Sequence, residues 1–280
     1  MKFLAVIILY NQNVGDCITL NSLNIAAKKI NICIDIIVYD NSEFEETYQW
    51  LFENLSLIKY KRDSNNSGVS VGYNFALNIA NLSGYKYLLL LDQDTDFSLN
   101  FIEEAVEAII KYPDINIFSP VLTFNNIIYS PCKYFLYRGW HFKNMSKGIK
   151  KIKHVNLLNS GLIINVKLLN NINGFNPKLK LYFSDFDFIN RCKKFITQYY
   201  CLGTICYHQL GSADKSNFEK TVVRFRYYSE GAKIISQKKP LSNIVYGAML
   251  LLRALKLSIH FKAIIFFRIY YNEFLANEIK

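Results

Sequence analysis

Hydrophobic residues in the first 120 positions alternate between two spacings. Four stretches are continuous apolar runs rich in β-branched and aromatic residues, at 3–9, 34–39, 87–91 and 115–118. Such runs are typical of strands that are covered on both faces, as in a parallel sheet. The segments between them carry apolar residues at helical spacing, in stripes that begin at Cys17, Val71 and Phe101. This alternation predicts an α/β domain whose parallel strands are joined by right-handed crossovers.

The rest of the chain carries weaker signals. Asn100 with Glu103 three residues later predicts a capping box at the start of the third helix. Residues 125–154 lose the pattern and gather aromatics and lysines, which predicts an irregular excursion of the kind that often carries substrate contacts. We then expect a strand over 155–166, a loop entering a helix over 177–191, a short strand over 205–208, and helices only after about residue 220.

Composition and charge divide the chain into two parts. The 280 residues are 51% hydrophobic and 20% charged, which argues against disorder and against a coiled coil. Residues 220–280 carry 11 Lys and Arg against 3 Asp and Glu, whereas residues 1–219 carry 22 against 19. We therefore predict a main domain over 1–219 and a basic helical region over 220–280.

The cysteines, the N-terminus and the apolar runs lead us to expect a cytosolic protein. The six cysteines form no C-x-x-C pair, which argues against a zinc ribbon or a thioredoxin-type site. The N-terminus shows no secretory signal, so we expect reduced thiols in a cytosolic protein. The longest charge-free run in the tail is 244–252, far short of the roughly 20 residues that span a membrane. We therefore expect no spanning helix.

The basic tail allows two interpretations. If it is one helix with 100° per residue, Lys256, His260 and Arg268 fall within about 60° of Arg253. A basic stripe on an apolar helix is typical of a protein that binds an anionic membrane surface. The alternative is a helix that packs on the main domain while its cations reach solvent.

The strongest chemical signal is a pair of acids after a strand. The run Tyr87–Leu91 ends in Asp92-Gln93-Asp94, and in extended geometry residues two apart point to the same side. Open parallel sheets bind ligands outside the carboxyl ends of their strands, and paired carboxylates there suit Mg²⁺ or Mn²⁺ carrying a diphosphate. The alternative is two solvated loop acids. A calcium loop is excluded because Phe97 stands where that loop requires glycine.

Three further positions are candidates for binding or catalysis. Asp40 ends a predicted strand and suits a nucleobase or ribose contact, although, taken alone, a turn that caps the next helix explains it better. Asp187 and Arg191 are four residues apart and predict an ordinary ion pair on a helix. Asp185 would then lie free just before that helix, either as a general base or as a cap. His208 ends a predicted strand before a turn expected at Gly211 and Ser212, and a lone histidine in such a place is usually structural.

The order of these segments resembles the family 2 glycosyltransferases of the GT-A fold, over roughly residues 3–212. The resemblance rests on an ordered set of motifs, each quoted from this chain: Tyr10-Asn11, Asp40-Asn41-Ser42, Asn65–Asn74, Leu91–Asp94, Asn159-Ser160-Gly161, Asn173-Gly174-Phe175, Ser184–Asp187 with Arg191, and His208–Ser212. The variant Leu-Asp-Gln-Asp also resembles bacterial rhamnosyltransferases that build surface polysaccharide from dTDP-rhamnose.

The resemblance implies a mostly parallel central sheet flanked by helices, with the C-terminal helices as an extension. It also implies roles on the donor side. Tyr10 and Asp40 would contact the nucleobase and ribose, Asn66 and Gly68 would line the same pocket, and Asp92 would face the ribose and diphosphate.

The resemblance further implies an inverting transfer. Asp94 would hold Mn²⁺ or Mg²⁺, with His208 near the metal or the diphosphate. Asp185 would be the base, although the family commonly has Glu-Asp where this chain has Ser184-Asp185. Asp187 and Arg191 would support the acceptor side.

The implied partners follow from this reaction. The donor would be dTDP-rhamnose, or alternatively a UDP-hexose or UDP-N-acetylhexosamine. The acceptor would be a glycan or lipid-linked oligosaccharide reached from the inner face of the cell membrane, with no nucleic acid involved. Two other classes of protein fit the sequence less well. A non-catalytic basic protein that binds membrane or nucleic acid would gain nothing from the paired acids, and a nucleotidyltransferase would need a Gly-rich loop after its first strand.

Overall fold

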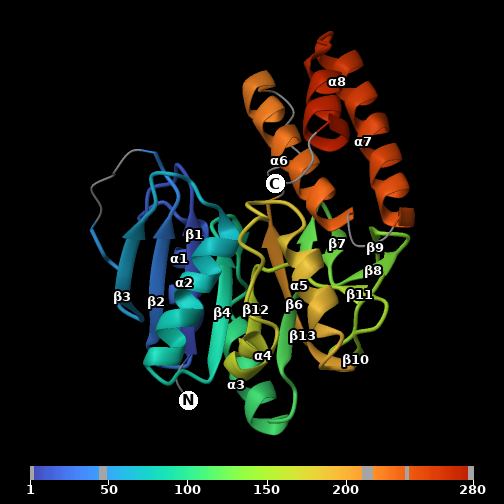
Figure 1. Ribbon diagram of the computed structural model, residues 1–280. Coiled ribbons are helices and arrows are strands. Elements are labelled where there is room, and N and C mark those ends of the chain that lie inside the picture. The colour runs from blue at the N-terminus through green and yellow to red at the C-terminus, as the bar shows by residue number, and fades with distance from the viewer. Residues whose placement is uncertain (1–2, 44–48, 210–216, 237–239, 277–280) are drawn as a thin grey trace.

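The computed structural model describes residues 3–43, 49–209, 217–236 and 240–276 (Figure 1). Within these residues one large sheet has ten strands. Eight follow one another in the order β10 (Gly148–Lys151), β13 (Gln198–His208), β6 (Ile117–Phe124), β12 (Leu162–Asn165), β4 (Tyr87–Asp92), β1 (Phe3–Leu9), β2 (Ile34–Asp40) and β3 (Leu55–Arg62). The short strands β5 (Thr95–Asp96) and β7 (Ile127–Ser130) pair with β13 and β6.

The N-terminal half of the sheet is parallel. Strands β3, β2, β1 and β4 all run in one direction, β12 is antiparallel to both β4 and β6, and β13 is parallel to β6. The predicted strands at 3–9, 34–39 and 87–91 are confirmed to within one residue. The fourth begins two residues later than predicted and continues to Phe124. We did not predict β3 because its exposed edge position allows polar residues along the strand.

Two layers of helices cover the sheet, as the two spacings predicted. Alternate residues of β1 enter two different cores: Phe3, Ala5 and Ile7 pack with α1 (Ile18–Lys29) and α3 (Phe101–Lys111). Leu4, Val6 and Ile8 pack with α2 (Val69–Leu82), α4 (Val166–Asn171) and α5 (Ser184–Cys192). Because both faces of the strand are buried, an unbroken apolar run is what this position requires.

Two local predictions are wrong. Asn100 precedes α3 but makes no side-chain cap, because Lys29 donates hydrogen bonds to both Asn100 and Glu103. The stretch 125–154 is not irregular: it forms β7, β8 (Cys132–Phe135), β9 (Arg138–His141) and β10. Strands of four residues that are largely exposed leave too short a pattern to detect in the sequence. The expected strand over 155–166 is split into β11 (Val155–Asn156) and β12.

The C-terminal region is helical from Phe218 to Ala276 within the described residues, as predicted, apart from a short break at 262–264. It comprises α6 (Phe218–Ser236), α7 (Pro240–Phe261), α8 (Ile265–Ile269) and a π-helical turn, η1 (Tyr270–Ala276). These helices enclose a third core around Phe225, Tyr246 and Phe266. Figure 1 shows them as a bundle standing at one end of the sheet. The division into units at residue 219 stays a prediction.

Two expectations for this region are corrected. Lys262 adopts a positive φ of 52° between α7 and α8, so Arg253 and Arg268 belong to different helices and the predicted continuous basic stripe does not exist. In addition, α7 has 22 residues and is long and apolar enough to cross a membrane by length and composition. The longest charge-free run therefore underestimated this apolar helix, because isolated cations ended the run without ending the helix. The expectation of no spanning helix stays a prediction.

Candidate active site

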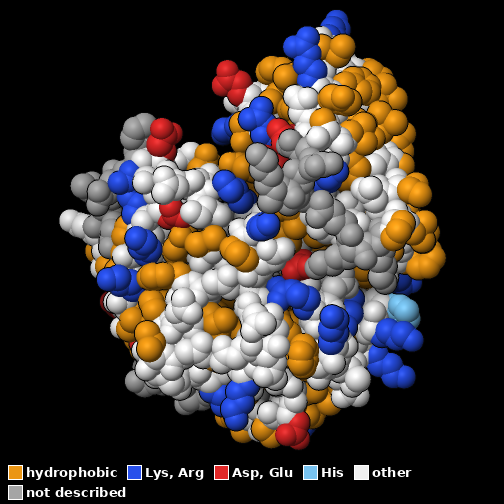
Figure 2. Space-filling model, in the orientation of Figure 1, with side chains coloured by type: hydrophobic (Ala, Val, Ile, Leu, Met, Phe, Trp, Pro, Cys, Tyr) orange, Lys and Arg blue, Asp and Glu red, His pale blue; other side chains and the backbone are white. Residues whose placement is uncertain are grey.

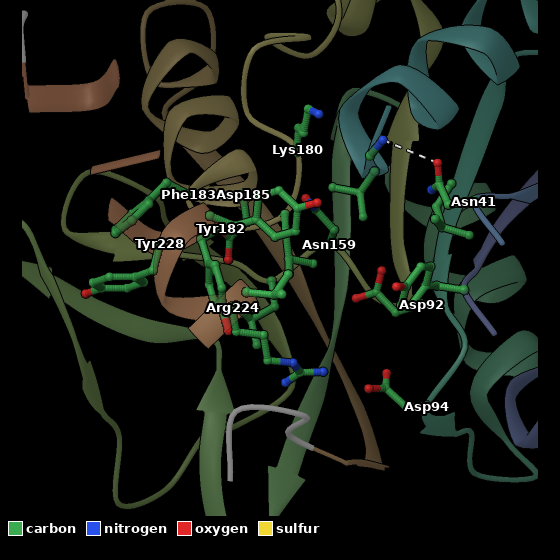
Figure 3. A pocket seen from close by; sticks show the side chains of 18 of the residues that line it. Asn41, Asp92, Asp94, Asn159, Lys180, Tyr182, Phe183, Asp185, Arg224 and Tyr228 are labelled. Carbon is green, nitrogen blue, oxygen red and sulfur yellow. Dashed lines mark hydrogen bonds between the residues drawn. The ribbon is translucent and has the colours of Figure 1, made fainter. Parts of the chain in front are cut away.

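A cavity of about 840 Å³ opens where the sheet meets the C-terminal helices. Its wall combines the ends of β4 and β13, the turn after β1, the segment that enters α5, and one face of α6. Figure 3 shows Asp92 and Asp94 on one side of this space and Asp185 on another. Most of the predicted site residues, far apart in sequence, therefore line a single cavity.

The predicted acid pair converges with His208. Ligand atoms of Asp92, Asp94 and His208 all lie within 4.8 Å of one another. The convergence arises differently from the prediction, because only Asp92 belongs to the strand and Asp94 lies in the turn that follows it. His208 reaches the pair because the end of β13 runs alongside β5, which directly follows Asp94.

The donor atoms of this cluster fit a divalent cation. Asp94 Oδ1 is buried and has no hydrogen-bond partner among the described residues, and it lies 3.4 Å from His208 Nδ1. Burial raises the pKa of Asp94 to about 6; His208 lowers that pKa and the neighbouring charge of Asp92 raises it. A buried, unpaired carboxylate oxygen beside a second carboxylate and an imidazole is a chemically suitable set for a hard divalent ion.

A hydrogen-bond chain fixes the position of His208. Its Nδ1 lies 2.7 Å from the hydroxyl of Thr95, and that hydroxyl lies 2.7 Å from the hydroxyl of Ser160. Ser160 in turn accepts a hydrogen bond from the backbone N–H of Asp92. The motif Asn159-Ser160-Gly161 therefore connects the strand that carries Asp92 to the histidine, which makes Thr95 and Ser160 supporting residues.

Asp185 lies in the first turn of α5, not before the helix as predicted. The residue that precedes the helix is Phe183, in a left-handed conformation with φ of 66°. One carboxylate oxygen of Asp185 accepts the backbone N–H of Phe186 at 2.8 Å, and the side chain lines the cavity. Burial raises the pKa of Asp185 to about 7, the hydrogen bond from Phe186 opposes that shift, and the charge of Asp92 adds to it.

Asp187 and Arg191 form the predicted ion pair. Arg191 Nε lies 2.8 Å from Asp187 Oδ2, and Arg191 Nη1 donates to the carbonyl oxygens of Ile172 and Gly174. Asp187 is buried, and neither residue lines the cavity. The pair anchors α5 to the turn at Asn173-Gly174, so its support is structural. Its predicted role toward an acceptor stays a prediction.

Besides Asp92, three of the predicted donor-side residues line the cavity: Tyr10, Asn66 and Gly68. Gly68 has a φ of 96°, and a Cβ there would lie 2.3 Å from the carbonyl oxygen of Lys180. Only glycine lets the start of α2 approach this backbone so closely. The contact holds Lys180 and the segment leading to Asp185 against the donor side of the cavity.

Asp40 lies beneath the cavity wall and does not line it. It is buried, its Oδ1 accepts from Ser42, and its Oδ2 accepts from the hydroxyl of Tyr60. The next residue, Asn41, lines the cavity instead, and its side chain accepts the N–H of Gly68 at 3.3 Å (Figure 3). The hydrogen bond from Ser42 forms the turn expected in the alternative, but the next described element is the strand β3 and no helix is capped there. The predicted contact of Asp40 with a nucleotide stays a prediction.

Sequence reasoning missed the contribution of α6. Lys220, Arg224 and Tyr228 line the cavity, and Figure 3 shows the guanidinium of Arg224 directed toward Asp94. The charge of Arg224 lowers the pKa of Asp94. Within the described residues, Arg224 has no ion pair. The sequence predicted a helical region rich in cations here, but the position of this region relative to the sheet is known only from the tertiary structure.

The turn expected at Gly211 and Ser212 lies outside the described residues.

Comparisons with known proteins agree with this architecture. The crystal structure of S. aureus TarS is 18% identical, with a TM-score of 0.51, and the match covers 85% of this chain and 42% of that chain. S. aureus TarS 1-349 in complex with UDP is 14% identical, with a TM-score of 0.54, over 100% of this chain and 93% of that chain. The complex of TarS 1-349 with UDP-GlcNAc is 14% identical, with a TM-score of 0.51, over 89% and 81%. This chain therefore spans less than half of the longer TarS chain.

The structural likeness establishes the expected GT-A type fold. A search of curated proteins finds no match. The sequence model of glycosyl transferase family 2 matches residues 5–161, which include the parallel strands, the Asp92–Asp94 turn and the Asn159-Ser160-Gly161 motif. On this match over more than half of its length, the chain belongs to glycosyl transferase family 2.

Proposed function

We propose that this nucleotide-sugar glycosyltransferase inverts the configuration of the transferred sugar and that Asp185 is its general base. The observation that carries the proposal is one cavity lined by two separate acidic centres. Asp185, with a pKa of about 7, is poised to take a proton at neutral pH. The Asp92, Asp94 and His208 cluster supplies the second centre, suited to a metal-bound diphosphate.

In the proposed reaction an acceptor oxygen attacks the anomeric carbon of the donor in line. Asp185 takes the proton of that hydroxyl as the new carbon–oxygen bond forms. The bond between the anomeric carbon and the diphosphate oxygen breaks, and its electron pair leaves with the nucleoside diphosphate. Asp94 and His208 would hold Mn²⁺ or Mg²⁺, which would supply positive charge against the leaving diphosphate.

We assign the nucleotide to the β1 side of the cavity. Tyr10 is half-exposed there, where its ring is free to contact a base, and Asn66 and Gly68 line the adjacent wall. In this assignment Asp92 faces the ribose and diphosphate. Asp40 acts from below by fixing the turn that carries Asn41.

Rhamnose from dTDP-rhamnose is the donor that the motif Leu91-Asp-Gln-Asp94 favours, through its resemblance to bacterial rhamnosyltransferases. A UDP-hexose or a UDP-N-acetylhexosamine is the second candidate. It is favoured by the structural likeness to TarS 1-349, which was solved with UDP and with UDP-GlcNAc.

We propose that the acceptor is a glycan or a lipid-linked oligosaccharide in cell-surface polysaccharide synthesis. The reaction would then take place in the cytoplasm, at the inner face of the cell membrane. Support comes from the exposed apolar side chains of the C-terminal helices, which lie next to the cavity.

A donor screen tests the proposal. The purified chain is incubated with dTDP-rhamnose, UDP-glucose, UDP-galactose and UDP-GlcNAc, each with Mn²⁺, Mg²⁺ or EDTA, and release of the nucleoside diphosphate is measured. We expect one donor to be hydrolysed or bound in a divalent-dependent manner. Absence of binding and hydrolysis with all four donors, in a folded protein, would contradict the proposed donor class.

A further inference from the structure

The outward face of α7 is an unbroken apolar surface. Six of its exposed large hydrophobic residues fall within an arc of about 100° when placed at 100° per residue. They are Leu241, Ile244, Leu251, Leu252, Leu255 and Ile259, of which Ile244 is 70% exposed. We call these six residues the α7 apolar face. Figure 2 shows hydrophobic side chains gathered over α7 and α8, with Lys and Arg at one end.

The opposite side of α7 is held by the rest of the protein. Tyr246, Leu250 and Ala254 are buried in the third core. The hydroxyl of Tyr246 donates to the carbonyl oxygen of Tyr137 at 3.2 Å, and Arg253 stacks over the ring of Tyr228 at 4.2 Å. If α7 crossed a membrane as an independent helix, all of these contacts would be lost, so the structure favours a helix that stays attached to the domain.

The charge around the α7 apolar face has one sign. Residues 240–272 contain no Asp or Glu. Lys256 on α7, Lys262 just after it and Arg268 on α8 are exposed. Arg253 does not join them because it stacks on Tyr228. An apolar stripe flanked only by cations is complementary to an apolar layer covered by anionic groups.

We infer that α7 docks the protein onto an anionic lipid bilayer as a peripheral, interfacial helix. The six residues of the α7 apolar face enter the headgroup and acyl boundary, and the flanking cations contact the headgroups. A second copy of the chain fits less well, because a symmetric contact between two such faces would place cations against cations with no acid in the segment to oppose them. Anionic headgroups supply the missing charge.

This docking orients the cavity. Met249, on the flank of α7, lines the cavity together with Tyr228 and Tyr137. The cavity therefore lies beside the surface that contacts lipid, within reach of an acceptor anchored there. This last step rests on the proposed function, whereas the docking itself does not.

Vesicle co-sedimentation of the full chain tests the docking. The probes are vesicles of phosphatidylcholine alone and vesicles with 30% phosphatidylglycerol, each at low and high NaCl. Wild type should bind the anionic vesicles and release them at high salt. Leu252→Glu with Ile259→Glu should abolish binding. Lys256→Gln with Arg268→Gln should weaken binding to anionic vesicles by about five-fold per cation, because each cation contributes roughly 1 kcal/mol. At high salt the difference between this variant and wild type should largely disappear.

Matched controls distinguish a specific effect of the α7 apolar face from a general effect of surface charge or hydrophobicity. Leu82→Glu removes an 88% exposed leucine at the end of α2, and Lys59→Gln with Lys61→Gln removes two exposed cations of β3. Both controls should bind as wild type does. Melting temperatures of all variants should match wild type, since every substituted side chain is exposed.

Three outcomes would overturn the inference. The first is wild-type chain that does not bind anionic vesicles. The second is Leu252→Glu with Ile259→Glu converting a dimer into a monomer without changing vesicle binding, which would make the face an interface between copies. The third is resistance of vesicle-bound protein to alkaline carbonate, which would indicate a spanning helix. Because vesicle binding needs no donor, a failed donor screen would leave the docking result unaffected, and the reverse also holds.

Discussion

The hydroxyl of Tyr73 donates a hydrogen bond to Asp92 Oδ1 at 2.8 Å, from a ring that is completely buried in α2. Burial and the charge of Asp92 raise the pKa of Tyr73 well above its ordinary value, so the hydroxyl remains a donor at any working pH. The first acid of the Asp92–Asp94 pair is therefore oriented from within the core, which leaves its other oxygen to face the cavity.

Tyr73→Phe should lower kcat/KM about ten-fold, a usual cost of losing a residue that orients a binding group. The free energy of unfolding should fall by roughly 1–3 kcal/mol, because the hydrogen bond is made to a charged group. Tyr87→Phe is the matched control: that tyrosine is equally buried, and its hydroxyl has no hydrogen-bond partner. It should keep full activity and equal or greater stability. Steady-state kinetics and urea unfolding of both variants check the prediction, and equal activity losses would contradict it.

Asp185→Asn should lower kcat by roughly 10²–10⁴-fold, since the amide cannot accept a proton. Donor affinity should be unchanged, and the melting temperature at pH 8 should not fall, because the variant no longer carries a charge in a site that disfavours it. Turnover near that of wild type would remove Asp185 from the mechanism.

Asp187→Asn provides the contrast on the same helix. Its carboxylate is buried against Arg191 and outside the cavity, so its loss should mainly destabilise the fold, by about 3–5 kcal/mol for breaking a buried pair. Activity per folded molecule, measured below the unfolding transition, should be largely kept. A stable but inactive Asp187→Asn would place that residue in the chemistry instead.

The pH dependence of the reaction should follow Asp185. Its pKa is raised to about 7, and the base acts only when ionised, so kcat/KM should rise about ten-fold per pH unit below 7 and level off above it. Asp185→Glu should shift this limb, whereas Asp187→Asn should not. A profile that is flat between pH 5.5 and 8 would argue against a titrating base at this position.

Asp94→Ala should remove the divalent-dependent part of nucleotide binding while leaving the protein folded. Its Oδ1 is buried without a hydrogen-bond partner, so removal of the carboxylate should raise stability in EDTA. Calorimetric titration of UDP and dTDP with and without Mn²⁺ measures the effect. Unchanged affinity under both conditions would show that this carboxylate holds no metal.

Arg224→Gln should raise the KM for the donor about ten- to a hundred-fold, the worth of a charge-assisted hydrogen bond to a phosphate. The reason is the direction of its guanidinium, toward the Asp94 side of the cavity. Arg226→Gln is the control two residues along α6, where the side chain is half-exposed and lies near Glu273. An equal rise of the donor KM in both variants would contradict a specific contact between Arg224 and the donor.

The sequence by itself determined the layered α/β architecture and the identity of most chemical groups. Strands buried on both faces must be apolar at every position, so the runs that became β1, β2 and β4 could be identified directly. Open parallel sheets bind ligands outside the carboxyl ends of their strands, so the acids Asp92 and Asp94 after a buried strand could be selected as candidates. Spacing singled out Asp185 only as a base or a cap and His208 only as a histidine at a strand end, and the ordered motifs gave both residues their expected roles.

Only the tertiary structure decided which of those groups share a cavity and which lie outside it. Asn41 lines the cavity and Asp40 does not, because Ser42 in the same turn and Tyr60 on the neighbouring strand β3 hold the Asp40 carboxylate. Arg224 reaches the Asp94 side of the cavity because the helical bundle packs across the end of the sheet, a long-range contact that leaves no local periodicity. The prediction of one continuous basic stripe was wrong because it assumed a single helix. The chain adopts a positive φ at Lys262, which ends α7 before α8 begins. Local pattern reports which face of an element is apolar, whereas the direction in which elements meet is set by packing between segments distant in the chain.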